Sequence, residues 1–158
     1  MRLTPLILAA TVVIPRPASA DAAPNLSPEG TWRTAGGHGF IEVYRCAGDG
    51  TLCGKLASFL IDPGDPNPQG LDLRNPDPAR RSRSLCGLVF MYGFRPDGPD
   101  AWSGGTVYDP ESGNTYSATL ILQADGRLGL HGYIGIPLFG RTETWTRETA
   151  PVPACPSH

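Results

Sequence analysis

The side chains that could carry acid–base or nucleophilic chemistry in this chain are few and scattered. Nucleophilic hydrolysis needs a Ser or Cys beside a base that a third group orients. The histidines are His38, His131 and His158, and no G-x-S-x-G motif accompanies them. His38 lies in a Gly-rich turn that could approach a ligand, but a solvent-facing side chain is the simpler interpretation, as it is for His131 on a predicted strand. We therefore assign no catalytic residue.

Paired carboxylates are the other arrangement that could support hydrolysis. Glycoside chemistry needs two carboxyl groups about 5 Å or about 6.5–9.5 Å apart around a sugar. Only Glu42 and Glu143 lie well inside predicted strands, and Glu143 shares a strand face with Arg141 and Trp145. Arg147 lies on the same face, so an ion pair with an arginine is the simpler interpretation of Glu143, and a polar group inside a pocket is the alternative. The sequence thus predicts a protein that is not an enzyme, and an enzyme acting on an envelope component is a third, weaker hypothesis.

The first twenty residues have the pattern of a signal peptide. Arg2 precedes an apolar stretch at residues 3–14, and Ala18-Ser19-Ala20 forms an A-x-A cleavage site. The stretch is shorter than the roughly 20 residues that span a bilayer, and no later segment is long enough. We expect cleavage after Ala20, no transmembrane segment in the mature protein, and a periplasmic or secreted location.

The charge of the mature chain excludes two classes of partner. Removal of Arg2 and Arg16 lowers the number of Lys and Arg residues from 13 to 11, against 15 Asp and Glu residues, for a formal charge of −4. The remaining arginines are scattered and form no basic stripe. We therefore expect no nucleic-acid partner, and attraction of the protein surface to anionic lipid is not a leading hypothesis. No cofactor motif is present.

The four cysteines of an exported chain favour disulfides over a metal site. A Gly-Asp-Gly turn midway between Cys46 and Cys53 would bring these two across a hairpin, and we predict that they pair. Cys86 and Cys155 could form a second bridge that tethers the tail, or both could stay free. No pair of close ligands typical of zinc accompanies them, so no metal is predicted.

The secondary-structure elements that would position these side chains are predicted to be strands. Runs of β-branched and aromatic residues bounded by Gly, Pro, Asp and Asn predict eight of them, at residues 30–33, 39–46, 52–61, 85–94, 104–109, 115–123, 128–133 and 141–147. Short turns at residues 47–50, 109–114 and 124–126 suit antiparallel hairpins. No window sustains a helical apolar stripe. We predict an all-β, single antiparallel up-and-down barrel at residues 29–148, between a flexible leader at 21–28 and an irregular tail at 149–158.

Residues 62–84, here called the Pro-rich loop, form the longest predicted connection. Its prolines exclude a ladder strand, and loops of this length are usually functional or disordered. Alternating Asp and Arg residues could order it through ion pairs, so we expect an ordered lid. Its candidates for contact with a partner are Asp72, Asn75, Arg81 and Arg83.

Aromatic residues are the candidates for a ligand pocket inside the barrel. Phe90, Tyr92, Tyr108 and Tyr116 are predicted to point inward, with Trp102 on a loop at the mouth. A solid core without a cavity would use the same residues.

The two ends of the strand-rich region resemble those of calycin-type barrels, in which the first and last strands are neighbours. Gly30-Thr31-Trp32 supplies a G-x-W opening, and Arg147 follows Trp145 in the last predicted strand. A guanidinium over an indole contributes roughly 0.5–2 kcal/mol. We expect Trp32 and Arg147 to close one end of the barrel and the pocket to lie at the other end.

The chain as a whole resembles the exported bacterial domain-of-unknown-function family 2147. The residues that carry this resemblance are Gly30-Thr31-Trp32, Glu42-Val43-Tyr44-Arg45-Cys46, Leu52-Cys53-Gly54, Asp72, Asn75-Pro76-Asp77-Pro78, Arg83, Leu85-Cys86-Gly87, Trp102, Gly104-Gly105, Tyr108-Asp109-Pro110, Gly113, Tyr116, Gly132-Tyr133, Leu138-Phe139-Gly140-Arg141 and Trp145-Thr146-Arg147. The resemblance implies a lipocalin-like barrel in the periplasm or secreted, and no assigned activity.

Two functions remain in competition. The leading hypothesis is a non-enzymatic protein that holds a small apolar or amphipathic ligand inside the barrel. The alternative is an interaction module with a solid core, whose Pro-rich loop binds a protein partner or a glycan of the cell envelope.

Overall fold

A computed structural model describes residues 27–155, so the predicted signal peptide, most of the leader and the last three residues of the tail lie outside the described residues. The described part contains eight strands and one short 3₁₀ helix, η1. In chain order these are β1 (Gly30–Arg33), β2 (Gly39–Arg45), β3 (Leu52–Phe59), η1 (Pro78–Arg80), β4 (Val89–Pro96), β5 (Ala101–Asp109), β6 (Asn114–Leu122), β7 (Leu128–Tyr133) and β8 (Gly140–Arg147).

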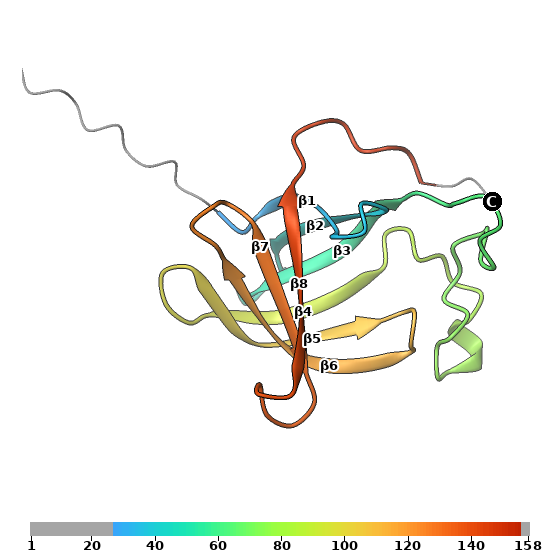
Figure 1. The fold of residues 1–158 in the computed structure, drawn as a ribbon. Helices are drawn as coiled ribbons and strands as arrows, with labels where there is room; N and C mark the ends of the chain where they lie inside the picture. Colours follow the sequence, from blue (N-terminus) through green and yellow to red (C-terminus); the bar gives the residue numbers. More distant parts are fainter. Residues whose placement is uncertain (1–26, 156–158) are drawn as a thin grey trace, which may run out of the picture.

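The strands form a closed barrel in which each pairs antiparallel with the next along the chain. The barrel closes between β1 and β8, where Trp32 lies opposite Arg147 and Arg33 lies opposite Thr146. Figure 1 shows the end of β8 beside β1. The predicted all-β, up-and-down barrel with little helix is confirmed.

Most predicted strand limits agree with the structure to within two residues, but two strands, β4 and β5, begin three or more residues from the predicted position. Residues 85–88 form backbone hydrogen bonds with the Pro-rich loop, from Leu85 N to Gly70 O, and with β3, from Gly87 N to Leu56 O. The β4 strand therefore begins only at Val89. At its other end β4 continues to Pro96, and a hydrogen bond from Asp97 N to the Ala101 carbonyl closes the turn to β5. The β5 strand therefore begins at Ala101, before Trp102.

The alternation of inward and outward side chains breaks inside β4. Gly93 has a φ of 78°, a left-handed conformation that favours glycine, and it separates two buried residues, Met91 and Phe94. A second break lies at Phe90 and Met91, which both face inward where the register with β3 shifts from Gly54 opposite Met91 to Lys55 opposite Val89. Tyr92, next to Met91, therefore points outward and is 48% exposed.

One half of the barrel is packed solid. We call it the sealed end; it carries the turns at residues 46–51, 97–100 and 123–127. Its core consists mainly of Trp32, Val43, Leu52, Phe94, Trp102, Leu120, Leu122, Leu128 and Trp145, all less than a tenth exposed. Close packing here uses glycine, since a side chain at Gly105 would overlap the ring of Phe94.

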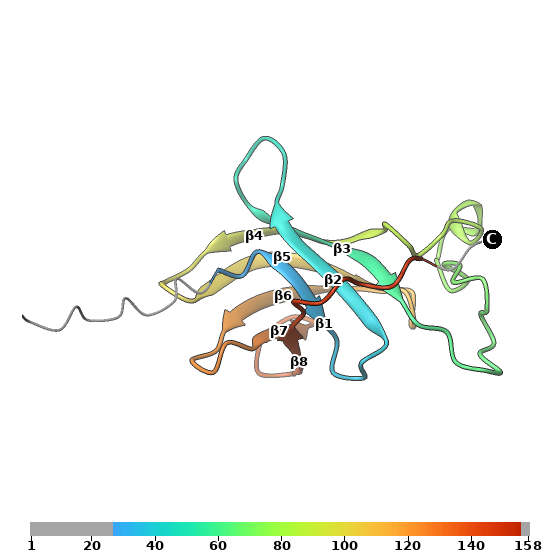
Figure 2. The same ribbon diagram turned by 90° about the horizontal axis from the view of Figure 1, so that it is seen from above.

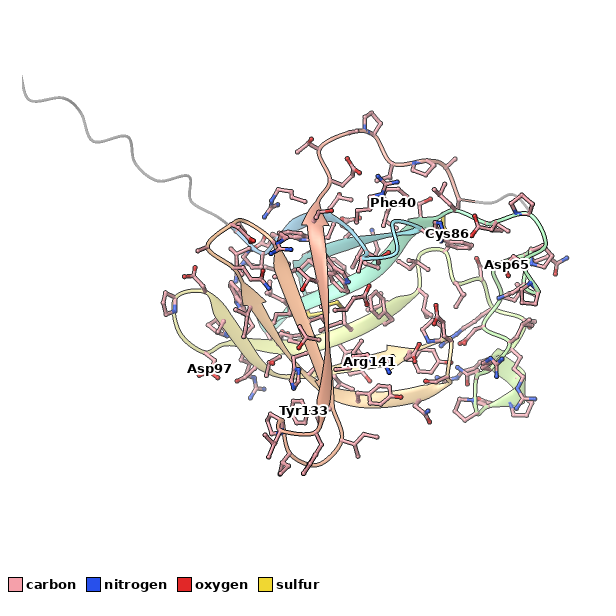
Figure 3. All side chains as sticks on the ribbon, viewed as in Figure 1. Phe40, Asp65, Cys86, Asp97, Tyr133 and Arg141 are labelled. Carbon is pink, nitrogen blue, oxygen red and sulfur yellow. A yellow bond between two sulfur atoms is a disulfide. The ribbon has the colours of Figure 1, made fainter. Side chains whose placement is uncertain are left out.

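The other half, the open end, carries longer connections, namely residues 34–38, 60–88, 110–113 and 134–139. The Pro-rich loop extends from this end on one side of the molecule, and the C-terminal tail runs from the end of β8 toward that side (Figures 1 and 2). In Figure 3, Asp97 in the β4–β5 turn and Asp65 in the Pro-rich loop mark opposite sides of the molecule.

Candidate functional site

A half-open cavity of about 1510 Å³ extends from the interior of the open end to the Pro-rich loop. Its mouth lies between the four connections of the open end, and its interior reaches Trp145, whose indole is 1% exposed. Trp145 also belongs to the packed core, so it forms the floor of the cavity. The barrel is therefore half solid and half hollow.

The cavity walls are mainly apolar. Seven strands each contribute an inward side chain, which are Ile41 from β2, Leu56 from β3, Phe90 from β4, Val107 from β5, Tyr116 from β6, Leu130 from β7 and Trp145 from β8. Gly132 adds a position without a side chain, and a Cβ atom there would make ordinary contacts at 3.8 Å with Tyr116 and Val107. Such a wall suits a hydrocarbon or aromatic ligand better than a strongly polar one.

The structure brings together three of the five aromatic residues proposed for the pocket. Phe90, Tyr108 and Tyr116 line the cavity. Tyr92 does not, because it follows the inward residue Met91 and points outward, where it lines a separate small pocket of about 210 Å³. Trp102 is in the core of the sealed end rather than on a mouth loop, so its predicted position is wrong.

Two charged residues of β8 also line the cavity, and for Glu143 this is the alternative interpretation from the sequence, a polar group inside a pocket. Arg141, Glu143 and Trp145 alternate along β8 and all three face the interior. Glu143 Oε1 accepts a hydrogen bond from Ala35 N at 3.4 Å. No ion pair joins Glu143 to Arg141 or Arg147 in the part of the chain that the structure describes, so the simpler interpretation of Glu143 is wrong. The period-two pattern of β8 was the signal that indicated the inward positions.

A buried polar cluster attaches the Pro-rich loop to the barrel. At its centre is Asp72, which is fully buried. Asp72 Oδ2 accepts from Arg83 Nε at 2.8 Å and lies 2.7 Å from Arg83 Nη2. Asn75 Nδ2 donates to the same oxygen at 2.7 Å, and the Tyr108 hydroxyl donates to Asp72 Oδ1 at 2.6 Å. Because Tyr108 belongs to β5, the cluster fixes the loop to the cavity wall.

The ionisation of Tyr108 reflects this environment. Burial disfavours the phenolate, and the hydrogen bond to the Asp72 carboxylate requires the neutral hydroxyl, so the pKa of Tyr108 is raised above its ordinary value. Arg83 also lies over the Tyr108 ring, with its Cζ atom 5.6 Å from the ring centroid. The hydroxyl is thus held as a neutral donor.

The four loop residues proposed for contact with a partner have mainly internal roles. Asp72 is inaccessible and Asn75 is only 4% exposed. Arg83 forms an ion pair with Asp72. Arg81 is exposed, and its Nε atom donates to the Asn75 carbonyl at 2.8 Å. The sequence indicated polar residues in the loop. It did not indicate that these residues form hydrogen bonds mainly with one another.

Two further contacts hold the Pro-rich loop and the tail. The turn between β5 and β6 packs against the loop so closely that a side chain at Gly113 would overlap the Arg74 carbonyl.

A disulfide joins Cys86, just after the loop, to Cys155 in the tail. The other disulfide, Cys46–Cys53, closes the β2–β3 hairpin at the sealed end. Both pairings considered from the sequence are present.

At the sealed end, Trp32 and Arg147 lie in contact. The Arg147 guanidinium carbon is 4.2 Å from the centroid of the indole, which is fully buried. Trp32 Nε1 donates to the Pro28 carbonyl at 2.8 Å, and Arg147 Nη1 donates to the Glu29 carbonyl at 3.0 Å. The chain entering β1 is therefore held across this end.

The histidines within residues 27–155 have structural partners. His38 Nδ1 lies 3.6 Å from Asp62 Oδ2, with both side chains exposed. His131 contacts the Thr142 hydroxyl at 2.8 Å and the Pro137 carbonyl at 2.7 Å, and so supports the β7–β8 loop. Over the same residues, no group of three His, Cys, Asp or Glu side chains could hold a metal ion.

An eight-stranded closed barrel, sealed at one end and hollow at the other, defines a lipocalin-like protein. A protein of Helicobacter pylori described as "Protein HP1028 from the human pathogen Helicobacter pylori belongs to the lipocalin family" has this fold, with a TM-score of 0.66 and 25% identity over 78% of this chain and 84% of its own. A profile of the family "Uncharacterized protein conserved in bacteria (DUF2147)" matches residues 30–147, and the chain belongs to that family. No curated protein matches it. Among the described residues there is no helix with the length and hydropathy of a membrane span.

Proposed function

We propose that this protein binds a small apolar or amphipathic ligand in the cavity at the open end, without catalysing a reaction. The observation that carries the proposal is the cavity itself, which has an aliphatic or aromatic side chain from each of six strands on its walls and Trp145 of β8 at its floor. Burial of a hydrocarbon chain against such walls is favourable by roughly 25 cal/mol per Å² of apolar surface removed from water.

The proposal includes export from the cytoplasm. Its support is the predicted signal peptide together with two disulfides, which persist in oxidising compartments such as the periplasm or the extracellular space. A carrier in such a compartment would hold apolar molecules that water does not dissolve.

The alternative proposal, that the Pro-rich loop binds a protein or glycan, has less support. Asp72 and Asn75 face the interior, which leaves Arg81 and part of Arg83 as contact residues. The cavity also removes the solid core on which that alternative depended.

Ligand binding is tested with a neutral fluorescent probe, N-phenyl-1-naphthylamine, added to the mature protein. We expect saturable binding that weakens at least about ten-fold in Gly132→Leu, because the new side chain would occupy the cavity. Ser117→Leu is the matched control, since Ser117 is exposed on the neighbouring strand β6, between inward residues Tyr116 and Ala118.

Two results would oppose the proposal. One is the absence of saturable probe binding to the folded wild-type protein. The other is equal loss of affinity in Gly132→Leu and Ser117→Leu. Native mass spectrometry of freshly purified protein, followed by extraction with organic solvent, then identifies any ligand that co-purifies.

A further inference from the structure

Arg141 is placed where it can contact the polar group of a ligand in the cavity. It lies on the inward face of β8 near the mouth, and its register partner on β7 is Gly132. Glycine has no side chain, so nothing from that position covers Arg141. Figure 3 shows the Arg141 side chain extending from β8 toward the side of the molecule with the Pro-rich loop.

The guanidinium of Arg141 has no carboxylate partner among residues 27–155. Glu143, the nearest acidic residue along the inward face of β8, accepts from Ala35 N instead. A guanidinium carries five N–H donors and matches the geometry of carboxylate and phosphate groups. A cation beside apolar walls is stabilised when an anion with good hydrogen-bond geometry pairs with it.

Acidic residues also occur at the mouth, but on its loops. Asp62 lies beside His38, and Asp65 accepts from the backbone of its own turn. Asp109 accepts from Glu111 N at 2.9 Å and from a neighbouring hydroxyl. Asp65 and Asp109 are thus hydrogen-bonded within the loops, and Glu111, which also lines the mouth, is exposed on the turn between β5 and β6. Arg141, in contrast, is on the barrel wall.

We infer that the ligand is an anionic amphiphile, oriented with its carboxylate or phosphate group at Arg141 and its hydrocarbon chain toward Trp145. The inference rests on the proposed function and names the ligand class for the same cavity. The cavity of about 1510 Å³ extends from Trp145 to the Pro-rich loop, a length that a long hydrocarbon chain can follow.

Four ligands with the same hydrocarbon chain test the inference. Palmitate, palmityl phosphate, palmityl alcohol and palmityl amine compete with N-phenyl-1-naphthylamine for the mature protein, each below the concentration at which it aggregates. We expect at least one anion to bind on the order of ten-fold more tightly than the alcohol, as for one charge-assisted hydrogen bond. The relative strength of the two anions then identifies the head group.

Variants of Arg141 test whether its side chain causes the preference for an anionic head group over the alcohol. Arg141→Gln should bring the affinities for anion and alcohol together, while Arg141→Lys should keep most of the difference. Arg95→Gln is the control, because Arg95 is exposed on β4 at the sealed end. Circular dichroism and thermal unfolding establish that each variant is folded.

The outcomes separate the inference from the proposed function. If the alcohol binds as tightly as both anions, or the amine binds most tightly, the head-group inference is wrong and binding in the cavity stands. An anion preference that survives unchanged in Arg141→Gln also overturns the inference. If neither the probe nor any of the four ligands binds, the proposed function itself fails.

Discussion

At the scale of single residues, the hydroxyl of Tyr108 connects the barrel wall to the Pro-rich loop. Tyr108→Phe removes the donor to Asp72 Oδ1 while keeping the ring, and leaves a fully buried carboxylate with one hydrogen bond fewer. We expect the free energy of unfolding to fall by about 1–3 kcal/mol at neutral pH. Denaturant unfolding with the disulfides intact measures this difference.

The difference in the free energy of unfolding between wild type and Tyr108→Phe should depend on pH, because the pKa of Tyr108 is raised. The neutral phenol favours the folded state, so its contribution is complete below the ordinary tyrosine pKa near 10 and decreases as the pH rises through the higher folded-state value. The gap between wild type and Tyr108→Phe should therefore narrow in alkali. Tyr44→Phe is the control, since no hydrogen bond of its hydroxyl occurs within residues 27–155. A gap that stays constant or widens above about pH 10 would refute this role.

At the scale of elements, the tail and the Pro-rich loop are joined at the open end by the Cys86–Cys155 disulfide. We expect the double substitution Cys86→Ser/Cys155→Ser to lower stability by about 2–4 kcal/mol and to speed release of bound probe, because the residues flanking the mouth are no longer tied together. Stopped-flow dilution of the probe complex measures the release rate.

The matched control for that experiment is Cys46→Ser/Cys53→Ser, which removes a disulfide from the sealed end. It should also lower stability but leave the release rate near that of the wild type. Equal acceleration in both double variants would mean that general loosening of the barrel controls release, and not the tether at the mouth.

The eight elements themselves were largely predictable from the sequence, because alternation and turn residues are local signals. Two exceptions came from backbone geometry that side-chain patterns do not encode. A register shift between β3 and β4 at Phe90 places Tyr92 on the outer face, and a tight turn after Pro96 lets β5 include Trp102. The burial of Asp72 could not be predicted either, because its partners Arg83 and Tyr108 meet it only in the folded protein.

At the scale of the whole molecule, the barrel divides into a sealed end that provides stability and an open end that provides the cavity. Arg147→Ala removes the cation over Trp32 and the hydrogen bond to the Glu29 carbonyl, both at the sealed end. We expect a lower melting temperature, equivalent to roughly 0.5–2 kcal/mol, with unchanged probe affinity. Gly132→Leu should instead lower the probe affinity and leave the melting temperature nearly unchanged. Loss of ligand affinity at full stability in Arg147→Ala would contradict this division of the barrel into two ends.

The position of the three tryptophans permits one direct test of the cavity. Trp32 and Trp102 lie in the core of the sealed end, and Trp145 is the tryptophan that lines the cavity. A long-chain fatty acid with bromine near its methyl end quenches an indole that it contacts. The measurement is tryptophan emission of the mature protein titrated with this ligand and with its unbrominated counterpart.

We predict saturable quenching by the brominated chain that is absent with the unbrominated chain, is lost in Trp145→Phe and weakens in Gly132→Leu, because the chain reaches the floor of the cavity. Absence of saturable quenching in the folded wild-type protein, or quenching that persists unchanged in Trp145→Phe, would contradict the account of a ligand held in the open end of the barrel.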